Sequence, residues 1–368
     1  MSIIQKIMPK IAIFLVMAIA FTVQAEASMG FSVTPSFPEN QLSNSGFYDL
    51  RITPGQQQDI IVTVSNPTDT EIVVAVEAFT VSTARGGTID YSSTRINDET
   101  LPYFMSELIA ISEPQVAVPP NSQIDVPLRL TAPDESFDGI LLGSLRFLRE
   151  PTEAEAQSSG AIMNRYAHAV AIRLSMNDRE LDADFALGEI TSQITNARAS
   201  IVVDVRNPVA RMARGVQAEA RIFELGSNEE IFYQSIDEVD FAPNSVFPFT
   251  MVDRAGYGIS AGMYRAEIRL DYQGQTWQFN QEFKIAPTQA ATVNTAARNQ
   301  NQRQVSQLAA EDTQMPPFVW ILIGAGVLAV AAAVILMIKQ KMKSNEILRQ
   351  MQQRIIEQDG KRSIYKPS

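Results

Sequence analysis

Over most of the chain, polar and apolar side chains alternate in short runs, a pattern that is typical of strands with one buried face. Residues 59–65 (DIIVTVS) and 71–79 (EIVVAVEAF) are clear examples, and Asn66-Pro67 supplies a turn between them. Similar runs follow at 124–130 and 140–148, without a comparably long stretch of helical period in this part of the chain. Such short β-branched runs predict antiparallel β-sandwiches rather than βαβ units.

The second half of this β-rich region repeats the first. Two runs end in Asn-Pro, two turns read Pro-Asn-Ser, and each Ser is followed 17 positions later by a Gly that opens another strand. The matching residues are Asn66 and Asn207, Asn121 and Asn244, Ser122 and Ser245, and Gly139 and Gly262. Because order and spacing agree, we expect an all-β fold of two tandem immunoglobulin-like β-sandwich domains.

The copies differ between their Asn-Pro and Pro-Asn-Ser signals, which are 55 residues apart in the first copy and 37 in the second. The first domain therefore carries an insertion of about 18 residues, around 82–112. Long loops on rigid sandwiches often carry binding, which makes Arg85, Tyr91, Tyr103 and Phe104 candidate ligand-binding residues. The alternative is an extra hairpin that packs Tyr103 and Phe104 into its own domain.

Hydropathy at the two ends of the chain indicates export and anchoring. Lys6 and Lys10 precede a short apolar run that ends in Ala25-Glu26-Ala27, the pattern of a secretory signal peptide. Residues 318–338 are apolar and uncharged, and at about 1.5 Å per residue they span a bilayer core. Lysines follow this span and acids precede it, so we expect a single-pass type I protein with a cytoplasmic C-terminus.

Polar, low-complexity stretches set the remaining boundaries. Residues 287–317 are rich in Gln, Asn, Ala and Thr without strand pattern, which predicts a disordered stalk. A strand at 166–176 follows a polar linker, so the first domain ends either near residue 155 or near residue 178. The predicted segments are a signal peptide (1–27), a first β-domain (28–152), a second β-domain (160–286), a stalk (287–317), a transmembrane helix (318–338) and a cytoplasmic tail (339–368).

Composition limits the chemistry. The chain has no Cys and one His, His168, which excludes thiol catalysis and thiolate or His-rich metal sites. No nucleotide-binding fingerprint occurs, and no pair of carboxylates stands out among the many acids. The net charge of −11 makes nucleic acid an unfavourable partner, and the cytoplasmic tail is basic while the exported part is acidic. We expect a binding protein without catalytic residues, cofactor or metal.

Four short motifs and their arrangement resemble a known family. They are Phe31-Ser32-Val33-Thr34-Pro35, Asn66-Pro67, Asp138-Gly139-Ile140-Leu141-Leu142-Gly143 and Asn164-Arg165-Tyr166-Ala167, between a signal peptide and a single helix with a basic tail. This assembly resembles the WxL-interacting proteins of Gram-positive bacteria. The resemblance implies a peptidoglycan-binding first domain, a second domain that binds host or matrix proteins, and a partner among exported WxL surface proteins at the cell wall.

Two functions from different classes follow. The first is a non-enzymatic cell-surface adhesion and assembly module that associates with peptidoglycan and with exported WxL-type surface proteins or host matrix proteins. The second is a membrane-tethered chaperone or sensor for an exported subunit, in which the tail reports inward.

Overall fold

The computed structural model describes most of the region between the two hydrophobic ends. The described residues are 30–92, 97–152, 165–256 and 258–311, followed by 324–326, 328, 331–339, 341–343 and 346. The predicted signal peptide and most of the predicted cytoplasmic tail lie outside these residues.

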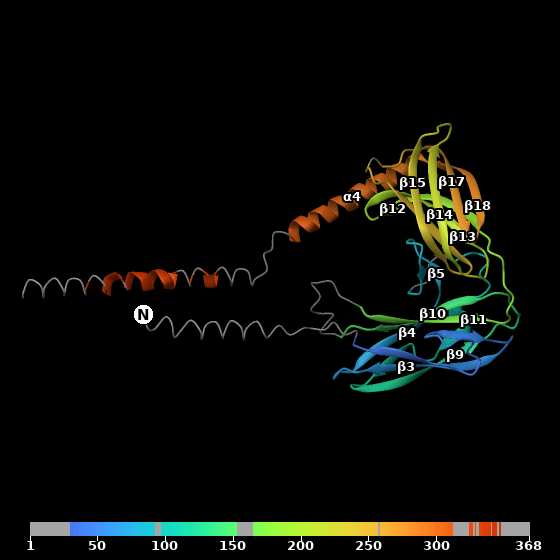
Figure 1. The fold of residues 1–368 in the computed structure, drawn as a ribbon, viewed down its shortest axis with the longest axis horizontal. Coiled ribbons are helices and arrows are strands. Elements are labelled where there is room, and N and C mark those ends of the chain that lie inside the picture. The colour runs from blue at the N-terminus through green and yellow to red at the C-terminus, as the bar shows by residue number, and fades with distance from the viewer. Residues whose placement is uncertain are drawn as a thin grey trace, which may run out of the picture. The chain divides into compact units, whose positions relative to one another are not determined.

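The first β-domain is a sandwich of two sheets (Figure 1). A four-stranded sheet has the order β1-β3-β9-β7, and a five-stranded sheet has the order β2-β11-β10-β4-β8. The bounds of the first sheet are β1 (Ser32–Ser36), β3 (Gln57–Asn66), β9 (Ser122–Thr131) and β7 (Ile109–Ile111). Those of the second are β2 (Tyr48–Arg51), β11 (Ala167–Ser175), β10 (Leu141–Arg149), β4 (Ile72–Thr80) and β8 (Gln115–Val118).

The second β-domain repeats this plan with fewer strands. Its three-stranded sheet has the order β12-β13-β16, and its four-stranded sheet the order β15-β14-β17-β18. The strands are β12 (Ala186–Thr195), β13 (Arg198–Asn207), β14 (Ala213–Glu224), β15 (Glu230–Phe241), β16 (Ser245–Val252), β17 (Gly262–Tyr272) and β18 (Gln275–Ile285). The expectation of an all-β fold with two tandem sandwiches is confirmed.

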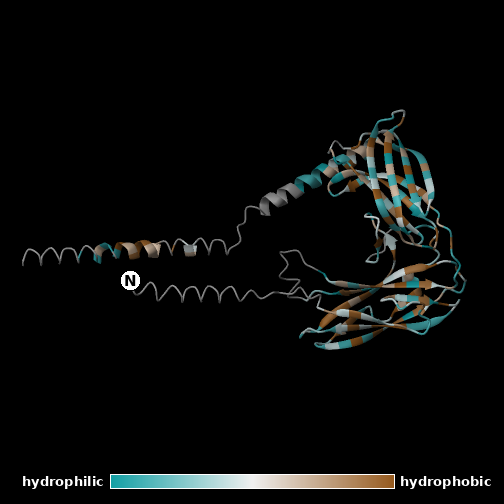
Figure 2. Ribbon diagram, in the orientation of Figure 1, coloured by the Kyte–Doolittle hydropathy of each residue, from teal (hydrophilic) through white to brown (hydrophobic). Residues whose placement is uncertain are grey.

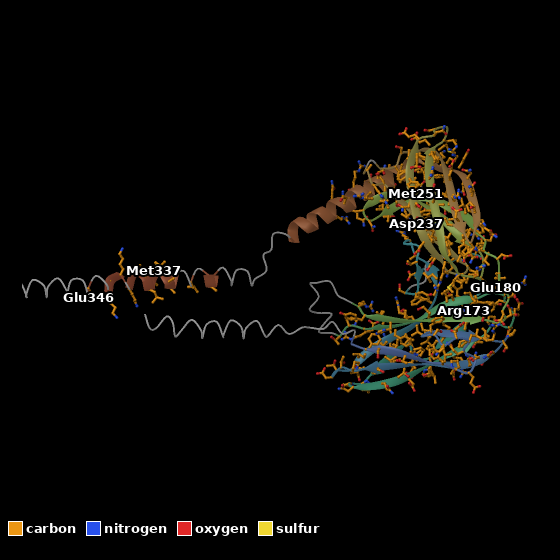
Figure 3. The ribbon with its side chains drawn as sticks, in the orientation of Figure 1. Arg173, Glu180, Asp237, Met251, Met337 and Glu346 are labelled. Atoms are coloured by element: carbon orange, nitrogen blue, oxygen red, sulfur yellow. The ribbon has the colours of Figure 1, made fainter. Side chains whose placement is uncertain are left out.

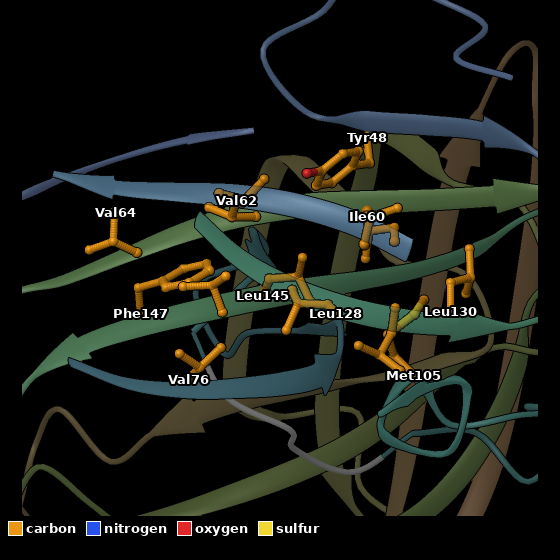
Figure 4. Close-up of a cluster of buried hydrophobic side chains, with 14 of the residues drawn as sticks. Tyr48, Ile60, Val62, Val64, Val76, Met105, Leu128, Leu130, Leu145 and Phe147 are labelled. Atoms are coloured by element: carbon orange, nitrogen blue, oxygen red, sulfur yellow. The ribbon is translucent and has the colours of Figure 1, made fainter. Parts of the chain in front are cut away.

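The alternation of side chains builds one core in each β-domain, as the hydropathy colours along the strands show (Figure 2). In β3, Ile60, Val62 and Val64 are buried every second residue, and they face Leu145 and Phe147 of β10 across the sandwich (Figure 4). Burying such side chains contributes roughly 1.5–3 kcal/mol each. Strand periodicity thus explains which residues form the core.

The Asn-Pro repeats mark the same structural position in both copies. Asn66 ends β3 opposite Ser122 of β9, and Asn207 ends β13 opposite Ser245 of β16. The amide nitrogen of Asn66 donates to the carbonyl oxygens of Thr70 and Pro119, at 2.8 and 3.0 Å. The Asn207 amide likewise donates to Arg211 and Ala242, at 2.9 and 2.7 Å, the residues at the equivalent places. The repeat is therefore a buried side chain that closes the end of the sandwich.

Strand β11 belongs to the first β-domain. It pairs antiparallel with β10 through eight partners, from Leu141 with Leu174 to Leu148 with Ala167, and parallel with β2 on its other side. Of the two boundaries that the sequence leaves open, this pairing agrees with the one near residue 178.

The residues expected to form a disordered stalk begin instead as helix α4, Pro287–Glu311. Pro287 opens the helix, where a missing N–H costs nothing, and Ala and Gln are favourable helix formers. Ala290, Val293 and Ala297 are buried on one face. The side-chain amide of Asn294 donates to the Ile259 carbonyl at 2.8 Å and accepts from the Ile259 N–H at 2.9 Å. Up to Ala297 the segment is thus helical and packed, because its small side chains fit against the second β-domain.

Beyond α4, one helix among the described residues, Gly324–Lys343, is long and apolar enough to cross a membrane, with a mean hydropathy of 1.7. It overlaps the predicted span at 318–338, whose first six residues lie outside the described ones.

We predict that Asn66→Ala lowers the free energy of unfolding of the first β-domain by about 2–3 kcal/mol, because buried carbonyl groups lose their donor. Chemical denaturation measures this loss, and Asn207→Ala should cause a similar loss in the second β-domain. Asn280→Ala, at an exposed position of β18, is the matched control and should change stability by less than about 0.5 kcal/mol. Equal effects of the buried and exposed substitutions would contradict the assigned role.

Candidate binding sites

The insertion of the first β-domain lies between β4 and β8 and forms a short hairpin followed by a helical turn. The hairpin pairs β5 (Ser82–Thr83) with β6 (Ile89–Asp90), and the turn is α2 (Met105–Leu108). Among the predicted ligand-binding residues, Arg85 is exposed between β5 and β6, and Phe104 is 41% exposed just before α2. Tyr91 and Tyr103 are half-buried. The four residues therefore occupy two separate parts of the insertion.

The two tyrosines contribute to packing. Tyr103 packs against the core of the first β-domain, as the alternative interpretation expects. Tyr91 joins a small apolar cluster in which Val81 and Leu142 come from the first β-domain and Met212 and Ala242 from the second. Burial raises the pKa of Tyr91, with Arg214 and Asp240 acting in opposite directions. This part of the insertion thus contacts the second β-domain.

Polar contacts of the hairpin continue the same interface. The Thr83 hydroxyl lies 2.7 Å from the Ser245 hydroxyl and accepts a hydrogen bond of 3.0 Å from the Ala242 N–H. Gly87, with φ +77°, offers its carbonyl to the Asp240 N–H at 2.7 Å, and a Cβ there would press on Val239. We call this interface between the insertion and the residues 206–212 and 239–245 the domain junction.

A charged pair lies within the domain junction. Arg206 donates from Nε and Nη2 to both carboxylate oxygens of Asp98, at 2.5 and 3.0 Å, and from Nη2 to Glu99 at 2.7 Å. The Asp98 side chain is fully buried and Arg206 is about one quarter exposed. Burial alone would raise the pKa of Asp98, but the hydrogen bonds from Arg206 and Thr100 outweigh it, and the pKa lies below its usual range.

The second Pro-Asn-Ser turn completes the domain junction. Asn244 adopts a left-handed backbone (φ +45°), and its carbonyl accepts the Asp98 N–H at 2.9 Å. Its side-chain amide donates to the hydroxyl of Thr100 at 2.9 Å and to the carbonyl of Pro208 at 3.1 Å. The matching Asn121 of the first copy has the same backbone conformation but is exposed. One copy of the repeated turn thus serves as a docking point.

The sequence pattern does not mark Asp98, Thr100 or Arg206 as contact residues. The difference in spacing locates the insertion, but no local pattern indicates that Asp98 reaches Arg206, 108 positions away. The only available signal is the repeated Pro-Asn-Ser turn, which marks Asn244 as an exposed loop position by analogy with Asn121. Pairing between distant loops depends on how the two domains dock.

The second β-domain presents a pocket of about 450 Å³ beside exposed apolar side chains. Glu224, Glu230, Tyr233, Arg254 and Ile259 contribute to its lining. Near it, Leu225, Ile231, Tyr233 and Met263 are 38–50% exposed, and the guanidinium of Arg221 lies 5.5 Å from the centre of the Tyr233 ring. An exposed Tyr with a stacked Arg is the composition favoured in protein interfaces. We call this group of four apolar residues the Tyr233 patch.

Within the described ranges, no group of three or more His, Cys, Asp or Glu side chains is placed to hold a metal ion. His168 is used locally: its Nε2 lies 2.9 Å from the Phe31 carbonyl oxygen, and its ring meets the Phe31 ring edge-on.

Comparison with protein families gives two matches, one over most of the first β-domain and one over strand β11 and the second β-domain. Residues 31–149 match the family described as WxL Interacting Protein, peptidoglycan binding domain. Residues 157–295 match the family described as WxL Interacting Protein, host binding domain. Together the two matches cover more than half of the chain, in the order that the sequence resemblance predicts. No match to a curated protein was found.

Similar solved structures include bacterial fimbrial chaperones. The crystal structure of the YadV chaperone is 10% identical and covers 69% of this chain and 100% of its own, with a TM-score of 0.27. The CsuC-CsuE chaperone-tip adhesion subunit pre-assembly complex of Acinetobacter baumannii is 10% identical, with coverage of 60% and 90% and a TM-score of 0.27. The Salmonella enterica SafA pilin in complex with the SafB chaperone is 13% identical, with coverage of 63% and 98% and a TM-score of 0.24. With TM-scores below 0.5, these likenesses support no conclusion about function.

We predict that Asp98→Asn weakens the docking of the two β-domains by about 2–4 kcal/mol, because Arg206 loses a charged partner in a mostly buried position. In wild type the same loss should occur in acid. The contribution of ionised Asp98 to docking is complete above the pKa of about 3.9 that an unfolded Asp has. It is lost as the pH falls through the lower pKa of Asp98 in the folded protein. Thermal unfolding of the compact unit ending at Ala297 should change from one transition to two.

The matched control for Asp98→Asn is Asp59→Asn, which removes the partner of Arg129 in an exposed pair on the first β-domain. It should cost less than about 1 kcal/mol and leave a single transition. A single transition in Asp98→Asn, or in wild type well below pH 4, would contradict the role given to this pair.

Proposed function

Because this chain belongs to the WxL-interacting protein family, we propose that it is a non-enzymatic, membrane-anchored protein of the cell surface that holds peptidoglycan and a protein partner at the same time. Its family matches are to a peptidoglycan-binding domain and a host-binding domain.

The observation that carries this proposal is that the two family matches fall on two sandwiches that are docked on each other, with β11 of the first sandwich as the one strand that lies in the second match. The insertion within the residues matched by the peptidoglycan-binding family bonds directly to strands of the host-binding match, through Thr83, Asp98 and Thr100. Such a connection fixes the orientation of one binding surface relative to the other, which a flexible linker would not do. The domain junction supplies it.

For peptidoglycan, the predicted residues of the insertion remain candidates, and their exposure divides them into two groups. Phe104 and Arg85 are exposed and could contact a sugar ring and a charged group, respectively. Tyr91 and Tyr103 are half-buried in packing roles, so their substitution would alter the fold as well as any contact. Phe104 is therefore the residue on which the glycan assignment is best tested.

On the protein side, we assign the Tyr233 patch as the contact surface. Its partner is an exported WxL-type surface protein or a host extracellular-matrix protein. Leu225 and Met263 are neighbours through the Leu225 N–H, which donates to the Met263 carbonyl at 2.9 Å, and Tyr233 lies on the edge strand β15. Exposed apolar residues with a central aromatic side chain support a protein ligand rather than a glycan.

The helix Gly324–Lys343 supports a membrane anchor. We propose that the two β-domains lie outside the cell, within reach of the wall, and that residues 339–368 lie in the cytoplasm. The proposed direction rests on the lysines that follow the apolar segment.

Two substitutions should separate the two ligands. Phe104→Ala should weaken co-sedimentation of the protein with isolated peptidoglycan by about tenfold and leave binding of a purified WxL-domain protein unchanged. Tyr233→Ala should weaken binding of the WxL-domain protein by about tenfold and leave co-sedimentation with peptidoglycan unchanged. Each variant is the control for the other, since both remove an exposed aromatic ring.

Opposite effects of the two substitutions on the two ligands would support both surface assignments. If both variants bind both ligands like wild type, the two surfaces are wrongly assigned. If wild type neither sediments with peptidoglycan nor binds the partner protein, the proposed function itself is wrong.

Removal of residues 344–368 tests the alternative of a sensor. A tether does not need these residues, so we expect unchanged surface display and unchanged attachment of cells to an immobilised partner. Loss of a transcriptional or signalling response after this deletion, with attachment intact, would favour the sensor over the tether.

A further inference from the structure

A polar pocket of about 890 Å³ lies where the first β-domain, the connection to the second and the loop Ala210–Met212 meet. It has the size of pockets that hold small-molecule or short-peptide ligands. Charged side chains of both signs dominate its lining, and no Phe, Tyr or Trp is among the lining residues. Figure 3 labels two of them, Arg173 and Glu180, which lie close together at this place.

The floor of the pocket is the outer face of the five-stranded sheet. Strands β2 and β11 run parallel, with Asp49 beside Arg173 and Arg51 beside Ser175. The residues between them, Leu50 and Leu174, point into the core and are fully buried. The strand period thus places four polar side chains on one surface, which the connecting residues 177–182 cover in part.

Three of the four arginines in the pocket already have protein partners. Arg51 pairs with Asp178, Arg179 bonds Asp138 at 2.6 Å, and Arg211 donates to the Leu181 carbonyl at 2.6 Å. These contacts fix the wall of the pocket. They leave Arg173 as the guanidinium available to a ligand.

Arg173 makes a longer contact with its carboxylate neighbour than the other three arginines make with their partners. Its Nη1 lies 3.5 Å from Oδ1 of Asp49, beyond good hydrogen-bond geometry, and its side chain is 37% exposed. The Arg173 Nε, Asp49 Oδ1 and the Ser175 hydroxyl are buried and lack hydrogen-bond partners among the described residues. Asp49 and Ser175 are 4% and 3% exposed. Adjacent buried polar groups without protein partners cost free energy, and a ligand with complementary groups would satisfy them.

The charged side chains of the pocket indicate which groups a ligand would carry. A guanidinium binds a carboxylate through two parallel hydrogen bonds, so Arg173 suits a free carboxylate. Glu180 and Asp182 are exposed carboxylates in the same lining and suit an amine. A ligand with both groups and with amide bonds between them would match the pocket.

We propose that this pocket binds the peptide stem of peptidoglycan, a short peptide with free carboxylates and an amine, while the glycan chain lies outside. The inference rests on the proposed function, because the wall is the source of such a peptide. It places the stem on the first sandwich, although Arg173 and Glu180 lie within the residues matched by the host-binding family. The absence of aromatic side chains from the lining favours a peptide over a sugar ring. Arg173 is assigned the stem carboxylate and Glu180 the stem amine.

The test uses the full chain in detergent micelles and isothermal titration calorimetry with a synthetic stem pentapeptide, L-Ala-γ-D-Glu-L-Lys-D-Ala-D-Ala. Wild type should bind it, and the same peptide with acetylated amines and amidated carboxylates should bind at least tenfold more weakly. Arg173→Gln and Glu180→Gln should each weaken binding of the free peptide at least tenfold. Arg129→Gln, an exposed arginine on the other sheet, should leave it unchanged.

Glu180→Gln changes an exposed side chain, so it keeps the test valid if Arg173→Gln disturbs folding, which thermal denaturation would reveal. Unchanged peptide binding by Glu180→Gln and by a folded Arg173→Gln would overturn the proposal. Equal binding of an all-L pentapeptide of the same composition would overturn the stem as the ligand.

Co-sedimentation of wild type with intact walls and with amidase-treated glycan lacking stems separates this proposal from the proposed function. Stronger sedimentation with intact walls is expected. Equal sedimentation with both, without binding of the free peptide, would overturn the stem site and leave peptidoglycan binding intact. Sedimentation with neither would overturn both.

Discussion

The left-handed turn at Asn244 is the constraint on which the docking of the two β-domains depends. Its carbonyl and its side-chain amide bond Asp98 and Thr100, and these bonds bring the Asp98 carboxylate against Arg206. Because the carboxylate is buried, it tolerates no other arrangement without losing its charged partner. The insertion can therefore adopt its observed place only when the second β-domain is folded beside it.

Local patterns in the sequence were sufficient for the architecture. Alternation predicts the strands, and Asn66 and Asn207 occupy the equivalent positions that their spacing suggests. The position of the insertion between the repeated turns is also correct. These features depend on side-chain period and turn chemistry, both of which act over a few residues.

Features that depend on packing between distant segments could not be predicted. Tyr91 fits an exposed binding loop in sequence, yet its neighbours Met212 and Ala242 come from the other domain. The polar composition of α4 suggests disorder, but Ala290 and Val293 are buried against the second β-domain, and this packing is not visible in the local sequence. Arg173 is one polar residue in an ordinary alternating strand, and the pocket around it exists only because the connecting segment folds over that face.

The first turns of α4 have a mechanical consequence for a chain anchored in a membrane. Tension from the anchor reaches the β-domains through this helix, where the side-chain amide of Asn294 donates to the carbonyl of Ile259 and accepts from its N–H. The helix must detach from that loop before the pull acts on β18, whose eleven residue pairs with β17 are then loaded. The packing of α4, which begins at Ala297 on the side of the anchor and includes the Asn294 contact, would thus yield before the sheet and lengthen the tether while the sheet remains intact.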